Sequence, residues 1–321
     1  MVHVSVIVCC YNSEKLLKDT LMHLAKQQLK DACAYEVILV DNNSNDNTAE
    51  VAKDIWREME CAVPLNVVIE SKPGLCYARK AGVLASKADI IVFCDDDNWL
   101  QSDYVQIAYE FMLANPTIGG LGGQSIGSLE NGEPAWWQEE KLNYAVGKQA
   151  IASGEISNRG YVWGAGLVVR RDALLKLYNT GFTSLLTGRK GKILASGDDS
   201  EICKWILLMG YKLWYLETLK FTHFIIEKRL TDAYLTKLKE GHNKSQHILK
   251  LYNWYLRVGT KNSDQKSMFL IVKKSTKLIV NGFLKKDNRW KEKLQLVIGS
   301  RIKIHPIIFE INKAFLLLKQ Y

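Results

Sequence analysis

Residues 90–97 read Ile-Ile-Val-Phe-Cys-Asp-Asp-Asp, an apolar run that ends in three carboxylates. The apolar run predicts a strand that is buried on both faces. Three adjacent carboxylates repel one another, so their clustering is unfavourable unless a cation compensates. Mg²⁺ and Mn²⁺ bind oxygen ligands and commonly bridge carboxylates to a diphosphate. The stretch therefore indicates either a cation site at the end of a buried strand or a solvated loop that caps a helix.

The same unit, a buried strand followed by a polar turn and a helix, also occurs before residue 90. Strands are predicted over residues 4–8, 36–40 and 67–70, and helices over 14–28, over 48–60 and from the turn at 72–74 to residue 88. Such alternation predicts a parallel sheet with right-handed crossovers and a ligand crevice at the carboxyl ends of the strands. The acidic residues lie at those ends.

The regular alternation stops near residue 116. A Gly-rich, Trp-bearing stretch then leads to a predicted strand at 167–170, and a Gly- and Lys-rich loop precedes a helix that begins at Asp198. Two further short strands are predicted at 211–216 and 221–226, and from Leu230 the pattern is helical and basic. We therefore predict an α/β domain over residues 1–229, with halves at 1–115 and 116–229, and a helical region over 230–321.

Composition limits the class of protein. The chain has 321 residues, 47% hydrophobic and 24% charged, which excludes disordered, collagen-like and small disulfide-rich proteins. The net charge of +9 is uneven, because residues 227–321 hold 21 of the 43 Lys and Arg but 7 of the 34 Asp and Glu. This asymmetry suggests two parts with different roles.

The basic region has apolar residues at helical spacing. These are Leu249, Leu251, Tyr252, Tyr255, Leu256, Leu294, Leu296 and Val297. Basic amphipathic helices bind anionic membrane surfaces, and the alternative is a helical cap packed on the preceding domain. Nucleic acid is the least favoured partner, because no known nucleic-acid-binding module is present.

The cysteines and the N-terminus indicate the compartment. Seven cysteines show no C-x-x-C pair, and no basic region followed by an apolar stretch opens the chain. No run approaches the roughly 18 apolar residues that a spanning helix needs. We expect a cytoplasmic protein, with attachment to the inner face of the plasma membrane left open.

Two further polar stretches follow predicted strands. Asp41 opens the loop 41–48 and could accept hydrogen bonds from a ribose or a uracil edge, although Asn and Asp also favour turns for local reasons. The turn at Lys72 and Gly74, with Arg79, could approach a phosphate or could be a surface turn.

A second acidic pair, Asp198-Asp199, lies at a predicted helix start, where carboxylates also serve as caps. A carboxylate at the mouth of a crevice could instead act as a general base. His223 lies at the end of a late strand and is either a structural residue or a metal or phosphate ligand.

Taken in order over about residues 3–230, these residues resemble a family 2 glycosyltransferase with the GT-A fold. Ser5-Val6-Ile7-Val8 with Tyr11-Asn12 resembles the opening strand and turn of that family, and residues 41–48 resemble its nucleotide-binding loop. Asp95-Asp96-Asp97 resembles its D-x-D metal motif, and residues 197–201 resemble its catalytic acidic motif. Further matching residues are Gly74, Ala78, Arg79, Ala81, Gly82, Trp163, Gly164, Ala165, Gly166, Arg170 and Arg171.

Two departures from the family pattern stand out. Cys10 occupies the place of a usual Pro, and the acidic motif reads Asp198-Asp199 where Glu-Asp is common. No Gln-x-x-Arg-Trp motif follows, which argues against a processive synthase.

The resemblance implies an inverting, hexosyltransferase-type enzyme that uses a nucleotide-sugar. Residues 1–115 would then bind the nucleotide and residues 116–229 the acceptor. Asp199 would be the general base, with Asp198 as its nearest rival, and Arg229 would lie near the diphosphate. Mn²⁺ or Mg²⁺ would be bound by Asp95, Asp97 and His223. The nucleotide would contact Tyr11, Asn12, Asp41, Asn43, Lys72, Gly74, Arg79, Asp95 and Asp96. The acceptor would contact Trp137, Trp163, Gly164 and Glu201.

The family also suggests partners. The expected donor is a nucleotide-sugar, with UDP preferred on family grounds, and the expected acceptor is a glycan or a lipid-diphosphate-linked sugar, as in surface polysaccharide (capsule or O-antigen) synthesis. Two other classes remain open: a nucleotidyltransferase that makes sugar nucleotides, and a non-catalytic glycan-binding scaffold.

Overall fold

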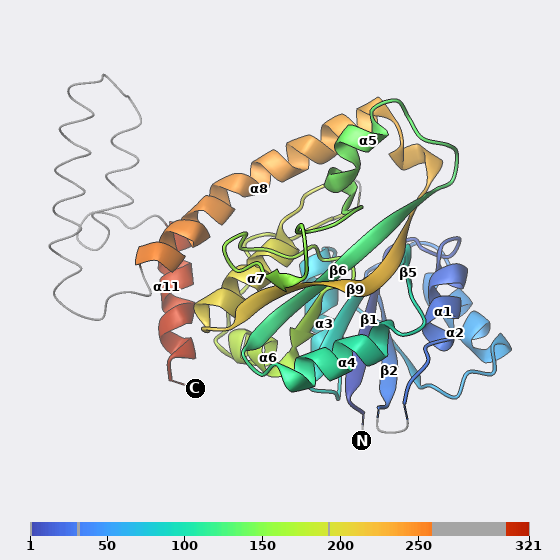
Figure 1. The fold of residues 1–321 in the computed structure, drawn as a ribbon, viewed down its shortest axis with the longest axis horizontal. Coiled ribbons are helices and arrows are strands. Elements are labelled where there is room, and N and C mark those ends of the chain that lie inside the picture. The colour runs from blue at the N-terminus through green and yellow to red at the C-terminus, as the bar shows by residue number, and fades with distance from the viewer. Residues whose placement is uncertain (1, 31–32, 192, 259–305, 321) are drawn as a thin grey trace, which may run out of the picture.

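A central mixed β-sheet organises the computed structural model, which describes residues 2–30, 33–191, 193–258 and 306–320 (Figure 1). In that part of the chain the sheet has nine strands in the order β3-β2-β1-β4-β8-β6-β9-β5, with β7 pairing β9. Their bounds are β1 (Val4–Cys10), β2 (Tyr35–Asp41), β3 (Leu65–Ile69), β4 (Ile90–Asp95), β5 (Asn98–Leu100), β6 (Ile118–Leu129), β7 (Gly154–Glu155), β8 (Val168–Arg170) and β9 (Lys212–Ile225).

The first four strands form the predicted parallel unit. β1 pairs in parallel with β2 on one side and β4 on the other, and β2 pairs in parallel with β3. The antiparallel β8 then joins β4 to β6. The helices are α1 (Leu17–Ala25), α2 (Thr48–Glu58), α3 (Leu75–Ala85), α4 (Tyr104–Ala114), α5 (Trp137–Glu140), α6 (Arg171–Asn179), α7 (Asp198–Leu208), α8 (Asp232–Val258) and α11 (Pro306–Leu318), with 3₁₀ turns η1 (Lys141–Tyr144) and η2 (Glu227–Arg229).

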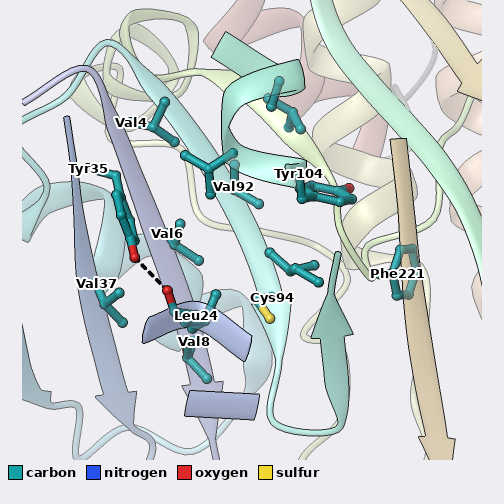
Figure 2. Close-up of a cluster of buried hydrophobic side chains, with 14 of the residues drawn as sticks. Val4, Val6, Val8, Leu24, Tyr35, Val37, Val92, Cys94, Tyr104 and Phe221 are labelled. Carbon is teal, nitrogen blue, oxygen red and sulfur yellow. Dashed lines mark hydrogen bonds between the residues drawn. The ribbon is translucent and has the colours of Figure 1, made fainter. Parts of the chain in front are cut away.

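Alternate side chains of β1 enter two different apolar cores, because successive residues of a strand face opposite sides of the sheet. Val6 and Val8 pack with residues of α1, α2 and α4. Ile7 packs on the other face with residues of α3, α6 and α7. Figure 2 shows the first core, in which the Tyr35 hydroxyl donates a hydrogen bond to the Leu24 carbonyl. Helices therefore cover both faces of the sheet.

The region around β6 differs from the sequence prediction. Residues 119–129 belong to the Gly-rich, Trp-bearing stretch for which no strand was predicted, yet they form most of a 12-residue strand. The two predicted short strands at 211–216 and 221–226 form the single strand β9. The glycines allow this pairing: a Cβ on Gly123 would lie 1.9 Å from the Leu219 carbonyl oxygen, and one on Gly119 would lie 2.5 Å from the Tyr211 Cβ. A sequence that looks like a loop is thus a strand packed closely against its neighbours.

The helix α8 runs along one side of the molecule and leads toward α11 (Figure 1). Its apolar residues Leu251, Tyr252 and Tyr255 are buried against Trp205 of α7 and residues of α11. Leu249 is also buried, whereas Leu294, Leu296 and Val297 lie outside the described residues. In the described part of the chain, the apolar face of the basic region packs on the α/β domain. None of the helices described there combines the length and apolarity needed to cross a membrane.

Candidate active site

A cavity of about 1090 Å³ opens at the carboxyl ends of β1 and β4. Parallel sheets place their ligand crevices at this position. Its walls come from the turn after β1, the acidic triplet after β4, the loop 159–165, the start of α7, the turn η2 and one face of α8. The cavity therefore gathers motifs that lie far apart in the sequence.

The three carboxylates of the acidic triplet have different surroundings. Asp95 and Asp96 are half-buried, and Asp97 is buried. Asp96 accepts a hydrogen bond from the Ser13 hydroxyl, and burial together with Asp97 raises the pKa of Asp96 to about 6. Burial also raises the pKa of Asp95, against the effect of Arg79. All three residues line the cavity.

His223 and Arg229, both predicted from sequence, meet at Asp97. The pairing of Asn98 with His223 between β5 and β9 brings the histidine beside the triplet, and its Nε2 lies 3.3 Å from the Asp97 Oδ1. Arg229 of η2 forms an ion pair with the other carboxylate oxygen. Burial alone would raise the pKa of Asp97, but His223 and Arg229 lower it well below its usual range.

The donor chemistry at the triplet fits a divalent cation. The carboxylates of Asp95 and Asp97 face one cavity, and carboxylate oxygens are ligands that Mg²⁺ and Mn²⁺ prefer. The Asp95 side chain is 33% exposed, and its nearest cationic group is Arg79 at 4.0 Å. Within the described ranges, no group of three or more His, Cys, Asp and Glu side chains is gathered closely enough to form a metal site by itself.

The turn after β1 and the loop after β2 are tied together. The backbone N–H of Asn12 donates a hydrogen bond to the Ser44 hydroxyl (3.0 Å). The backbone N–H of Asn45 donates one to the side-chain Oδ1 of Asn12 (2.8 Å). Tyr11 and Asn12 line the cavity. Asp41 is buried and accepts from the Ser44 amide at 3.0 Å, outside the cavity wall. The structure therefore gives Asp41 a loop-fixing role.

Asn42 lies in the loop 41–48 that resembles the nucleotide-binding loop of the family, but it was not among the individual residues predicted to contact the nucleotide. Its Nδ2 donates to the carbonyls of Glu70 (3.1 Å) and Lys72 (2.8 Å), and its Oδ1 accepts from the Gly74 amide (2.8 Å). It also lines the cavity, whereas the exposed Asn43 does not. Asn42 directly follows β2, which pairs in parallel with β3, and this position at a strand's carboxyl end is the sequence feature that could have indicated a cavity residue.

The three predicted phosphate-side residues separate in the structure. Lys72 is exposed, with its Nζ 4.0 Å from the centre of the Tyr77 ring. Gly74 is buried at φ +140° and precedes α3, next to the cavity residues Pro73 and Leu75. Arg79 is buried and lines the cavity, so it alone of the three reaches it.

Arg79 joins the two acidic motifs. Its Nη1 lies 2.5 Å from the Asp198 carboxylate, and its Nη2 lies 4.0 Å from that of Asp95. Burial alone would lower the pKa of Arg79, but Asp198 and Asp95 raise it, so the guanidinium stays charged. Arg79 thereby fixes the start of α7 relative to the end of β4.

Asp198 and Asp199 differ in accessibility. Asp198 is buried against Arg79, and burial raises its pKa to about 6. Asp199 is half-buried, and its carboxylate accepts hydrogen bonds from the amides of Gly164 (2.8 Å) and Ser200 (2.6 Å). Both line the cavity, but of the two only Asp198 forms an ion pair with a described residue.

The predicted acceptor residues divide into two pairs. Trp163 and Gly164 line the cavity beside Asp199. Trp137 is instead 3% exposed and packs with Tyr144, Ile225 and residues of α8. Glu201 is 2% exposed and accepts hydrogen bonds from the Tyr252 hydroxyl (2.7 Å) and the Leu185 amide (3.1 Å). The prediction that Trp137 and Glu201 contact the acceptor is therefore wrong. Both side chains are buried in the packing between elements and do not line the cavity.

The wall formed by α8 was also missed. It contributes Tyr234, Lys237, Leu238, His242, Ser245, Gln246, Leu249 and Asn253 to the cavity. Burial lowers the pKa of His242, although the nearby Asp199 raises it. No local motif marks these residues, because only tertiary packing brings α8 to the cavity.

A scan against protein-family models matches residues 5–177 to the model described as "Glycosyl transferase family 2". The chain belongs to glycosyl transferase family 2. This assignment confirms the family predicted from the strand, triplet and helix motifs.

Curated members of family 2 are similar over parts of the chain. Glycosyltransferase GlyA of Streptococcus pneumoniae serotype 4 is 29% identical over 243 residues, 73% of this chain and 32% of the relative. Poly(ribitol-phosphate) beta-glucosyltransferase of Bacillus spizizenii is 28% identical over 37% of this chain and 19% of the relative. The matches thus span about a third or less of these curated relatives.

A solved structure resembles the whole chain. S. aureus TarS residues 1–349, in complex with UDP-GlcNAc, aligns with a TM-score of 0.53 and 14% identity over 99% of this chain and 90% of the TarS chain. At this identity the likeness concerns the fold, and it confirms the predicted GT-A fold of this family 2 member.

Proposed function

We propose that the chain transfers a sugar, with inversion, from a nucleotide-sugar to a hydroxyl of a glycan or lipid-linked acceptor. The observation that carries this proposal is the half-buried Asp199, which shares one cavity with the acidic triplet and is held there by the Gly164 amide at 2.8 Å. Family membership supports the reaction class. The names of relatives that act on poly(ribitol-phosphate) support a surface-polymer acceptor.

Asp199 would remove the proton from the acceptor hydroxyl as that oxygen attacks the anomeric carbon from the face opposite the leaving group. The two amides that donate to its carboxylate fix its orientation. Asp198 is committed to Arg79, which supports the choice of Asp199 over its neighbour.

Tyr11, Asn12, Asn42 and Asp96 line the part of the cavity where the nucleoside would bind. UDP is the preferred nucleotide, a choice supported by the UDP-GlcNAc bound to the similarly folded TarS. Asp41, Asn43, Lys72 and Gly74 would act through the loops that they shape.

Asp95 and Asp97, with His223, would hold Mn²⁺ or Mg²⁺ in this scheme. Such an ion would neutralise the charge that develops on the departing diphosphate. Arg229 contacts Asp97 and lines the same cavity, so it would add a second positive charge there.

The basic region 230–321 would hold the enzyme at an anionic membrane surface on the cytoplasmic side. This part of the proposal rests on charge, because each Lys or Arg near such a surface contributes about 1 kcal/mol. Flotation of the full chain with vesicles of anionic and of neutral lipid tests it, and binding to neither would refute it.

The decisive experiment is release of nucleoside diphosphate from UDP-, GDP- and dTDP-sugars with Mn²⁺, Mg²⁺ or EDTA. We expect metal-dependent release from one donor and its loss in Asp97→Ala. Release of pyrophosphate would instead identify a nucleotidyltransferase. Absence of turnover together with absence of calorimetric UDP binding in the presence of Mn²⁺ would favour a non-catalytic scaffold.

A further inference from the structure

Lys204 of α7 is a buried cation in the cavity wall that lacks a counter-charge among the described residues. It is 3% exposed and lines the cavity. Two other cations there, Arg79 and Arg229, form ion pairs with Asp198 and Asp97. In the described part of the chain, the Lys204 ammonium has no hydrogen bond or ion pair.

The fold leaves space for this ammonium. Gly160 adopts φ +78°, and a Cβ built on it would lie 2.3 Å from the Lys204 Nζ and 3.9 Å from the Asn253 Oδ1. The lysine tip therefore lies where the loop before Tyr161 approaches α8. Burial lowers the pKa of Lys204, because a desolvated ammonium without a partner is unfavourable.

A second cation lines the same cavity beside the base. The Arg159 guanidinium lies 4.2 Å from the centre of the Tyr161 ring and 5.3 Å from that of Trp163. Its Nη1 donates to the Gln149 carbonyl at 2.8 Å. Trp163 directly precedes Gly164, whose amide holds Asp199. Lys204 and Arg159 therefore belong to the wall that would face an acceptor.

We propose that Lys204, together with Arg159, binds an oxyanion carried by the acceptor, either a phosphate ester or a carboxylate, and so selects anionic acceptors. An oxyanion would give the ammonium the ion pair that it lacks, and lysine binds phosphate as a point charge. A neutral acceptor would offer the ammonium no counter-charge. The inference rests on the proposed sugar transfer, because that reaction defines the acceptor side of Asp199.

The test is calorimetric titration of the full-length protein with glycerol 3-phosphate, glucuronate, glycerol and glucose, with and without saturating UDP. We expect at least one of the two anions to bind the UDP-saturated protein and the neutral compounds not to bind. Preference between the two anions distinguishes a phosphate ester from a carboxylate. Lys204→Met should weaken anion binding at least about tenfold, the usual effect of losing a charged hydrogen bond, and leave UDP affinity unchanged.

The matched control is Lys148→Met, because Lys148 is an exposed lysine paired with Glu217. It should retain anion binding. If Lys204→Met does not fold, Lys204→Arg should bind the anion and Lys204→Gln should not. Equal binding by wild type and the uncharged variants would overturn the proposal.

Two other outcomes would also overturn it. One is failure of both anions to bind the wild-type protein. The other is binding that UDP abolishes, which would assign the cations to the donor diphosphate. Failure of UDP itself to bind would count against the proposed sugar transfer, while the titration without UDP would still test Lys204.

Discussion

At the scale of single residues, the two adjacent carboxylates of α7 are separated by their partners. Asp198 is bound by Arg79, whereas the donors that the described residues offer to the Asp199 carboxylate are backbone amides. We expect Asp199→Asn to lower kcat at least about 100-fold, because it removes the proton acceptor, and to leave donor affinity nearly unchanged. Steady-state kinetics and calorimetric UDP binding measure the two effects.

Asp172→Asn is the matched control for that substitution. Asp172 also lies in the first turn of a helix, but it is exposed and paired with Lys176. The control should keep full turnover. Normal turnover in Asp199→Asn itself would refute its assignment as the base.

Gly164 supports a second prediction. A Cβ at this position would lie 2.4 Å from the Arg79 Nη2 and 3.0 Å from the Asp199 Cβ. Gly164→Ala should therefore displace both side chains, lower kcat at least about tenfold and destabilise the protein by about 1 to 3 kcal/mol. Gly154→Ala, where a Cβ would have nothing within 4 Å, is the control. Unchanged kinetics in Gly164→Ala would show that the contact relaxes without consequence.

Part of the candidate site could be predicted from sequence because the residues follow strands. Asp95 is the last residue of β4 and Asn12 lies two residues after the end of β1, and parallel strands bring their carboxyl ends together. Trp137 and Glu201 could not be excluded in this way. Their burial depends on packing against α8, which a local motif does not encode.

At the scale of elements, β6 shows how local composition misled the prediction. Glycine is depleted in strands, so no strand was predicted for the Gly-rich residues 119–129. In the fold, Gly119 and Gly123 are required because β9 and the residues around it lie too close for a side chain. The parallel strands β1, β2 and β4 carry continuous apolar runs and were predictable for that reason.

Glu201 connects α7 to α8 and to the loop that contains Leu185, and it makes their packing sensitive to pH. It accepts hydrogen bonds from Tyr252 of α8 and from the Leu185 amide, and burial raises its pKa to about 7 from 4.5. The folded protein thus holds this proton more tightly than the unfolded chain. The resulting stability is fully present below pH 4.5 and is lost as the pH rises through about 7.

We therefore expect Glu201→Gln to remove this pH dependence. Between pH 5 and pH 8 the free energy of unfolding of wild type should fall by about 2 to 3 kcal/mol more than that of the variant. Urea denaturation at both pH values measures the difference. The control is Glu50→Gln on the exposed side of α2, which should keep the pH dependence of the wild-type unfolding free energy. Equal changes in unfolding free energy with pH for wild type and Glu201→Gln would disprove the prediction.

At the scale of the whole molecule, the cavity depends on both halves of the α/β domain and on α8. Residues 1–115 supply Tyr11 and the acidic triplet, residues 116–229 supply Asp199, and α8 supplies His242. The predicted boundary at residue 230 separates segments that share one apolar core, in which Trp205 of α7 contacts Tyr252 of α8. We infer that α8 and the sheet unfold together.

Hydrogen exchange tests this inference. Amides in the buried middle of α8 should exchange only through global unfolding, so their free energies of opening should match those of β1 within about 1 kcal/mol. Saturating UDP should raise the free energies of opening of the α8 and β1 amides equally, because a ligand that binds only the folded state stabilises the entire cooperative unit. Tyr252→Phe removes the hydrogen bonds to Glu201 and Trp205, so it should lower the free energies of opening of the α8 and β1 amides by the same amount. If α8 opened several kcal/mol below β1 and did not respond to UDP, it would be an independent appendage, and the cavity would lack a permanent wall on that side.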